Sequence, residues 1–177
     1  VKRLSKRLGV ELFLALRRAV ALERLPYQIR AQISSFEWPR RAWQSRLEAA
    51  DVIFVSGGTS PHLMYWIEKS GLKELLPELL KTRLWVGISA GSIIMSPTLA
   101  LSNPEKTPWY KEKFGYEAKA GLGFIDFYIR PHLNAENSAH SSTESLEKIA
   151  KEIPKTIYGI DDQMAIKVVD GKVEVIG

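Results

Sequence analysis

Ser89 is the residue whose surroundings most clearly suggest chemistry, because it sits at the centre of Gly87-Ile88-Ser89-Ala90-Gly91. A Gly-x-Ser-x-Gly segment lets a serine occupy a tight strand-to-helix turn, since small neighbours leave room for the hydroxyl to project from the sheet edge. The apolar run 84–88 leads into the turn as a predicted buried strand, and a helix-compatible stretch, 92–95, follows it. This context predicts that Ser89 is the nucleophile of a hydrolase.

A second glycine loop, Ser56-Gly57-Gly58-Thr59, follows the short apolar run 51–55, which also predicts a buried strand. In a parallel sheet, loops that follow strands meet at the carboxyl edge, where α/β proteins bind ligands. We therefore expect the backbone N–H groups of this loop, with that of Ala90, to form an oxyanion hole.

A serine nucleophile needs a base, and the chain offers three histidines. His132 directly follows the predicted strand 124–129, and so lies at the same carboxyl edge. His62 begins a predicted helix and His140 lies in a serine-rich polar stretch, so both are expected at the surface. These positions favour His132 as the base.

The base in turn needs an acid that orients its imidazole. Asp161 and Asp162 end the predicted strand 156–160, and Glu105 lies beyond the nucleophile turn. Position along the chain does not decide among these three acids.

The remaining elements alternate between strands and helices. Helices are predicted at 61–70, with Gly71 as the stop, at 72–81 and at 142–152. Segments 164–169 and 172–176 flank Asp170-Gly171, a strong signal for a β-hairpin. The pattern predicts a single α/β domain over residues 1–177, with a mostly parallel sheet, helices on both faces and a C-terminal hairpin.

The basic character of the chain is confined to one end. Residues 1–46 hold eleven Lys and Arg against three Asp and Glu, whereas residues 47–177 hold fourteen against seventeen. Within the basic segment, 4–25 has the period of an amphipathic helix, interpreted as one that packs on its own domain rather than on a membrane or an acidic partner. Nucleic acid is therefore not an expected partner, and no apolar run is long enough to span a membrane.

The chain contains no cysteine, which excludes a cysteine nucleophile and a glutaminase of the amidotransferase type. It also excludes disulfides and thiolate metal sites, and it fits a cytoplasmic location.

Four motifs together resemble the dipeptidase E group of serine peptidases, which includes the aspartyl dipeptidases and is related to cyanophycinases. They are ADVIFVSGG (50–58), VGISAGSIIMSP (86–97), YIRPHL (128–133) and GIDDQMAI (159–166). The resemblance covers residues 47–177, while residues 1–46 are divergent. It implies a fold akin to class I glutamine amidotransferases, with serine replacing cysteine.

By that resemblance Ser89 is the nucleophile, His132 the base, and Gly57, Gly58 and Ala90 the oxyanion donors. The acid of the last motif falls on Asp162, where many relatives carry glutamate, and Glu105 is the alternative acid. The glycine loop reads Gly58-Thr59-Ser60, whereas the family usually continues Gly-Gly-Asn-Thr.

The function expected is hydrolysis of small peptides by a Ser-His-Asp/Glu mechanism that needs no metal or organic cofactor. The substrate side chain is not specified, and a homodimer is compatible with the sequence. Two other functions stay open: an α/β-hydrolase-type esterase, and an inactive binding protein on the same scaffold. The order Ser89, His132, Asp162 favours the peptidase, because an esterase places its acid before its histidine.

Overall fold

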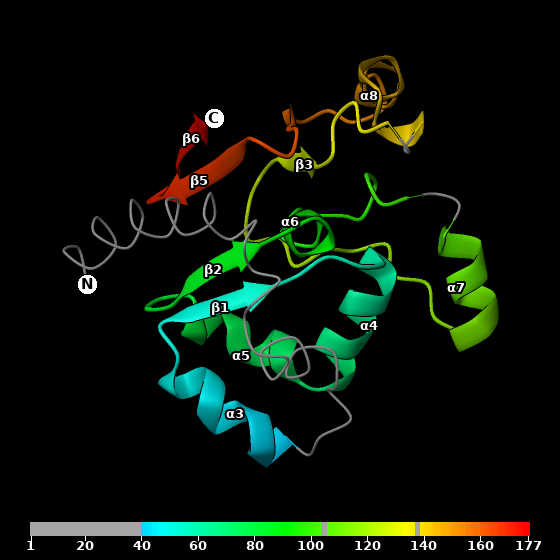
Figure 1. Ribbon diagram of the computed structural model, residues 1–177. Coiled ribbons are helices and arrows are strands. Elements are labelled where there is room, and N and C mark those ends of the chain that lie inside the picture. The colour runs from blue at the N-terminus through cyan, green and yellow to red at the C-terminus, as the bar shows by residue number, and fades with distance from the viewer. Residues whose placement is uncertain (1–39, 104–105, 137–138) are drawn as a thin grey trace. The chain divides into compact units, whose positions relative to one another are not determined.

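The computed structural model describes residues 40–103, 106–136 and 139–177 (Figure 1). The helices are α3 (Arg40–Ala49), α4 (Ser60–Lys69), α5 (Leu72–Leu79), α6 (Ala90–Ile93), α7 (Lys106–Phe114) and α8 (Thr143–Ala150), with a 3₁₀ turn, η2 (Ala139–Ser141). The strands are β1 (Val52–Val55), β2 (Leu84–Gly87), β3 (Tyr128–Arg130), β4 (Ile157–Gly159), β5 (Ala165–Val169) and β6 (Lys172–Ile176).

The described residues fall into two compact units. The first unit comprises 40–53 and 67–85, and the second comprises 54–66 and the described residues from 86 to 177. The chain crosses between units within β1, α4 and β2, so that the first halves of β1 and β2 belong to the first unit and their ends to the second. The described residues that the sequence assigns to chemistry all fall in the second unit.

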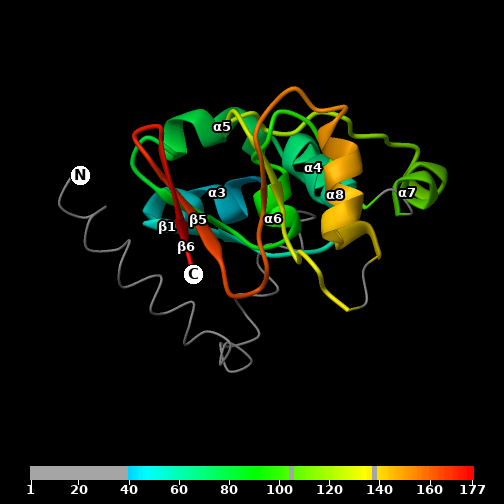
Figure 2. The same ribbon diagram turned by 90° about the horizontal axis from the view of Figure 1, so that it is seen from above.

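The described strands form three two-stranded sheets. β1 and β2 run parallel, since the Leu84 amide donates to the Asp51 carbonyl and, four residues on, the Ile88 amide donates to that of Val55, both at 2.9 Å (Figure 1). β3 and β4 are also parallel, whereas β5 and β6 form an antiparallel hairpin whose strands lie side by side in Figure 2. The predicted α/β class is confirmed, in the form of small parallel sheets with helices.

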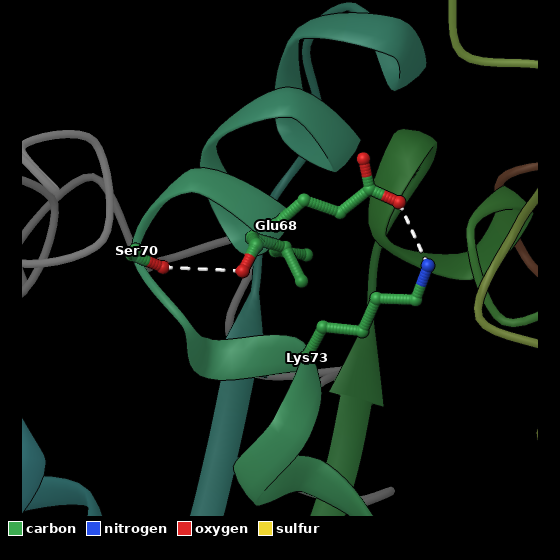
Figure 3. A network of polar contacts seen from close by, with 4 residues as sticks. Glu68, Ser70 and Lys73 are labelled. Atoms are coloured by element: carbon green, nitrogen blue, oxygen red, sulfur yellow. Dashed lines mark hydrogen bonds and ion pairs between the residues drawn. The ribbon is translucent and has the colours of Figure 1, made fainter.

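In the first unit, α5 presents Leu72, Leu76 and Leu79 on one face, and all three are buried. This spacing buries about one residue per turn, which is why so short a helix is stable against its unit. α4 ends where Gly71 takes φ = 75°, a left-handed conformation that glycine adopts without strain. At this junction Lys73 reaches across to Glu68 at 2.7 Å, and the Ser70 hydroxyl donates to the Ile67 carbonyl (Figure 3).

The hairpin predicted around Asp170-Gly171 is confirmed. Both turn residues have positive φ, 50° and 74°, as a two-residue turn of this type requires. The predicted strands 51–55 and 84–88, the helices 61–70, 72–81 and 142–152, and strand 156–160 also occur, each within a few residues of its expected bounds.

The predicted strand 124–129 is wrong over most of its length, since only Tyr128–Arg130 is a strand. The preceding residues are held against the end of α6 instead. The Leu122 amide donates to the Ile94 carbonyl at 2.6 Å, and the Phe124 amide donates to that of Met95 at 3.0 Å. These backbone amides are therefore already bonded and cannot donate to a neighbouring strand.

Two helices of the structure, α3 and α7, have no counterpart in the sequence-based prediction. The predicted amphipathic helix 4–25 and the candidate acid Glu105 lie outside the described residues. No helix within the described ranges is both long and apolar enough to cross a membrane.

Gly91→Ala should destabilise the second unit strongly, because a Cβ on Gly91 would lie 2.2 Å from the Val55 carbonyl oxygen. Gly115→Ala is the matched control: its φ is 66°, but a Cβ there meets nothing within 4 Å. We expect losses in the free energy of unfolding of about 3 kcal/mol for the first and about 1 kcal/mol for the second. Urea unfolding of both variants measures the difference, and equal losses would contradict the close approach.

Candidate active site

Ser89 occupies a strained turn between β2 and α6. Its φ of 54° and ψ of −114° lie outside the regions that most residues adopt. Gly87 permits the turn, because a Cβ there would lie 2.3 Å from the Gly91 carbonyl oxygen. The Ser92 hydroxyl closes the turn by donating to the Gly87 carbonyl at 2.7 Å. Such strain persists only where the surrounding structure holds it, and it clusters at functional sites.

The glycine loop after β1 lies against the Ser89 side chain. A Cβ built on Gly57 would be 3.1 Å from the Ser89 Cβ and 3.4 Å from its Oγ. Gly58 has φ = 136°, which few other residues adopt. Among the backbone hydrogen bonds of the described residues, none uses the N–H group of Gly57, Gly58 or Ala90 as a donor. The three expected oxyanion donors are thus free of backbone acceptors within this part of the chain.

His132 and Asp162 meet at the ends of β3 and β4. Arg130 of β3 is in register with Gly159 of β4, so the residues that follow both strands leave the sheet at the same edge. The distance between His132 Nδ1 and Asp162 Oδ1 is 2.7 Å. A carboxylate only accepts, so Nδ1 carries the proton and, in the neutral ring, Nε2 keeps the lone pair of a base. Both side chains are open to water, 44% and 74% exposed.

Asp161 has a different place from Asp162. Its carboxylate accepts a hydrogen bond from the Gln163 amide at 2.8 Å, and its carbonyl accepts from the Met164 amide. This is a local turn in which the aspartate side chain holds its own backbone. Of the two adjacent acids that position along the chain left open, Asp162 is the one that contacts the imidazole.

The structure brings the predicted residues together in two pairs. Ser89 lies beside Gly57, and His132 contacts Asp162, but among the described residues no hydrogen bond joins His132 to Ser89. Within the same residues there is also no cluster of three or more His, Asp or Glu side chains arranged to hold a metal ion.

The expectation that His62 lies at the surface is wrong, because it joins a half-buried aromatic cluster between α4 and α7. The Trp66 indole N–H donates to His62 Nε2 at 3.1 Å, and Tyr110 Oη lies 2.8 Å from Nδ1. An indole nitrogen only donates, so Nε2 must be unprotonated and Nδ1–H donates to Tyr110. Burial lowers the pKa of His62 below its ordinary 6.5 and raises that of Tyr110 to about 12.

His140 is likewise half-buried rather than a surface residue. It lies in η2, and its backbone carbonyl accepts a hydrogen bond from the Arg130 guanidinium. Neither His62 nor His140 contacts the Ser89 turn through a described hydrogen bond.

A strained serine between a strand and a helix, with a glycine loop beside it and a His-Asp pair where two parallel strands end, is an arrangement typical of serine hydrolases. The sequence profile of peptidase family S51 matches residues 14–176. The chain belongs to this family. The match begins inside the basic N-terminal segment and runs through all four motifs.

Curated relatives are similar over most of this chain. An uncharacterized peptidase of Listeria innocua is 28% identical over 72% of this chain and 64% of its own length. Peptidase E of Streptomyces coelicolor is 27% identical over 75% of this chain and 54% of its own length. The chain therefore spans less than two thirds of these relatives.

A crystal structure of a peptidase E candidate from Listeria monocytogenes has a similar fold. Its TM-score is 0.60 at 28% identity, over 75% of this chain and 62% of that one. The expected relation to dipeptidase E proteins is therefore confirmed by sequence and by structure.

The sequence-based prediction missed the aromatic cluster around His62 and the burial of Arg130. The cluster had one signal in the sequence, since His62 and Trp66 are four residues apart on a predicted helix and so share a face. Arg130 is buried, at 5% exposed, although it is charged. Its signal is that a cation ends the apolar run Phe127-Tyr128-Ile129 and directly precedes Pro131-His132.

Acid should weaken the fold through His62. Its pKa is depressed in the folded protein, so the unfolded chain binds a proton first as the pH falls below 6.5, and stability is lost from there downward. His62→Gln should lose less thermal stability than the wild type between pH 7.5 and 5, because it removes this titration. Melting temperatures at both pH values test this, with His140→Gln as the control. An unchanged pH dependence in His62→Gln would contradict the proposed neutral ring.

Proposed function

We propose that this chain is a serine-type peptidase of the dipeptidase E kind, with Ser89 as nucleophile and small peptides as substrates. The observation that carries the proposal is the strained backbone of Ser89, at φ = 54° and ψ = −114°, beside a glycine loop. Family membership supports it. The whole fold would then be of the class I glutamine amidotransferase kind, with serine where those enzymes carry cysteine.

In this mechanism Ser89 Oγ attacks the scissile carbonyl carbon while Nε2 of His132 takes its proton. Asp162 accepts from Nδ1–H, which keeps the lone pair on Nε2 and stabilises the imidazolium that forms. The protonated ring then gives its proton to the leaving amine. Water, activated by the same nitrogen, hydrolyses the acyl-serine. No hydrogen bond joins Ser89 to His132 among the described residues. The proton transfer from Ser89 Oγ to His132 therefore requires the two side chains to approach when substrate binds.

The carbonyl oxygen becomes negative in the tetrahedral intermediate and needs donors that are already in place. The N–H groups of Gly57, Gly58 and Ala90 fit this role, since Gly57 lies beside the Ser89 side chain, Ala90 directly follows Ser89, and none of the three has a backbone acceptor among the described residues. Each donor of this kind contributes about 3 kcal/mol of barrier lowering. α6 is a single turn, so the individual N–H groups matter more than a helix dipole.

An esterase of the α/β-hydrolase type is the weaker alternative. It would need an acid before His132, and the available Asp126 pairs with Lys155 instead. An inactive scaffold would require an unreactive Ser89, which the strained turn disfavours.

Ser89→Ala should abolish hydrolysis, by about 10⁶-fold in kcat, because the hydroxyl is the nucleophile. Alanine tolerates this turn as well as serine does, so the circular dichroism spectrum should be unchanged. Ser56→Ala is the matched control, an exposed serine after β1 at the start of the glycine loop, and should keep its activity. Turnover of a panel of dipeptides measures both variants. Retained turnover in a folded Ser89→Ala protein would remove the proposal.

Asp162→Asn should lower kcat by up to about 10⁴-fold, because an amide can hold the ring in the wrong tautomer. The exposure of this carboxylate to water should make the loss smaller than for a buried acid. Asp161→Asn is the neighbouring control and should be close to wild type, since its amide oxygen still accepts from Gln163. If both variants were fully active, Glu105 would become the acid to test, by Glu105→Gln.

A further inference from the structure

Arg130 is a charged residue in the interior of the second unit. It is 5% exposed, and among the described residues no carboxylate forms an ion pair with it. Burial lowers the pKa of its guanidinium. Charges are rarely buried without a partner, because the desolvation cost is several kcal/mol. The cost of burying Arg130 must be offset by the contacts that its guanidinium makes.

The guanidinium of Arg130 joins two loops through their backbone carbonyls. Nη1 donates to the Leu101 carbonyl at 2.5 Å, and Nη2 donates to the His140 carbonyl. Leu101 lies in the loop that follows α6, and His140 lies in η2. The planar fork of an arginine can serve two acceptors at once, whereas lysine presents a single nitrogen and an apolar residue none.

The backbone of Arg130 starts the loop that carries His132. Its carbonyl accepts from the Ile160 amide at 2.9 Å, and the Leu133 amide donates to the Ile160 carbonyl at 2.9 Å. Between them His132 has φ = 59°, a left-handed conformation that a non-glycine residue keeps only under constraint. The loop is therefore held at its start and just after His132, with the strain in between.

The same loop is held on its other side by η2. The Asn134 amide donates to the Ser141 carbonyl at 2.7 Å. The preceding carbonyl, that of His140, accepts from Arg130. The Asn134 side-chain oxygen accepts from both the amide and the hydroxyl of Thr143 at 3.1 Å. One chain of contacts thus runs from Arg130 through η2 to Asn134, two residues beyond His132.

We propose that Arg130 is a positioning residue, whose bridge between the loop after α6 and η2 holds His132 in the strained conformation that meets Asp162. The inference rests on the proposed function, in which His132 is the base. Arg130 acts through the loop and does not touch the reacting atoms. Loss of the fork should therefore affect the chemical step more than substrate binding.

The test compares Arg130→Lys and Arg130→Gln with the wild type on a dipeptide that the wild type cleaves. Both variants should lose 10- to 100-fold in kcat with KM within about threefold, since neither provides a planar cationic fork for two carbonyls. A folded variant with wild-type kcat overturns the proposal, as does a loss confined to KM. Recovery of wild-type kcat in Arg130→Lys alone also overturns it, because charge rather than the fork would then suffice.

A readout independent of turnover separates this inference from the proposed function. Ring ¹⁵N spectra of His132, assigned with His132→Gln, should show the proton on Nδ1 in the wild type and an averaged tautomer in the Arg130 variants. If the wild type cleaves no peptide but this change appears, the proposed function fails while the positioning role stands. An unchanged His132 spectrum in folded Arg130→Gln overturns the positioning role whatever the activity.

Asn134→Ala covers the case in which the Arg130 variants do not fold, because Asn134 is exposed and the substitution buries no charge. It removes the acceptor for Thr143 and places alanine at φ = 58°, where asparagine is better tolerated, so it loosens the loop next to His132 while the Asn134 amide can still bond to Ser141. We expect a smaller fall in kcat and the same direction of change in the His132 spectrum. Wild-type kcat and spectrum in this variant would overturn the proposal.

Discussion

The close contact between the nucleophile turn and the end of β1 is the constraint on which the rest of the site depends. The Gly91 backbone lies so near the Val55 carbonyl that only glycine fits, and the Ile88 amide donates to the same carbonyl. This contact fixes where the Ser89 turn starts relative to the residue from which the glycine loop departs. Gly57 consequently lies beside the serine side chain. An oxyanion hole built from two separate loops is possible only if this spacing is fixed.

The other half of the site depends on hydrogen bonds rather than on close packing. The parallel pairing of β3 with β4 brings His132 and Asp162 to one edge, where both are exposed. Water screens such a pair, so its Coulombic contribution to stability is small. Its value lies in fixing which nitrogen carries the proton. The strained φ of His132 is held by the backbone bonds around it and by the Arg130 bridge, which links this loop to the one after α6.

Sequence alone predicted the elements whose signals are local. The β-hairpin followed from Asp170-Gly171, the end of α4 from Gly71, and the serine turn from two glycines at fixed spacing. α3 and α7 were missed because their sequences, RRAWQSRLEA and KTPWYKEKF, lack a clear apolar face. The strand predicted at 124–129 failed because residues 122–124 bond to the end of α6, a long-range pairing that no local pattern reveals.

The acid and the histidines show the same limit. Asp161 and Asp162 are identical in type and adjacent in sequence, and only their hydrogen bonds separate a turn residue from the partner of His132. His62 was expected at the surface because α7 was not predicted. Tyr110, which covers His62 in the fold, belongs to that helix. Residues whose roles depend on a partner far along the chain could not be assigned before the fold was known.

The central claim, that Ser89 is an activated nucleophile served by His132, is tested most directly by mapping where a fluorophosphonate probe reacts. Peptide mass spectrometry of the labelled protein should find a single adduct on Ser89. The adduct should be absent from Ser89→Ala and much slower to form in His132→Gln, since the base generates the reactive alkoxide. Absence of labelling in the folded wild type, or an adduct on any other serine, would contradict the account.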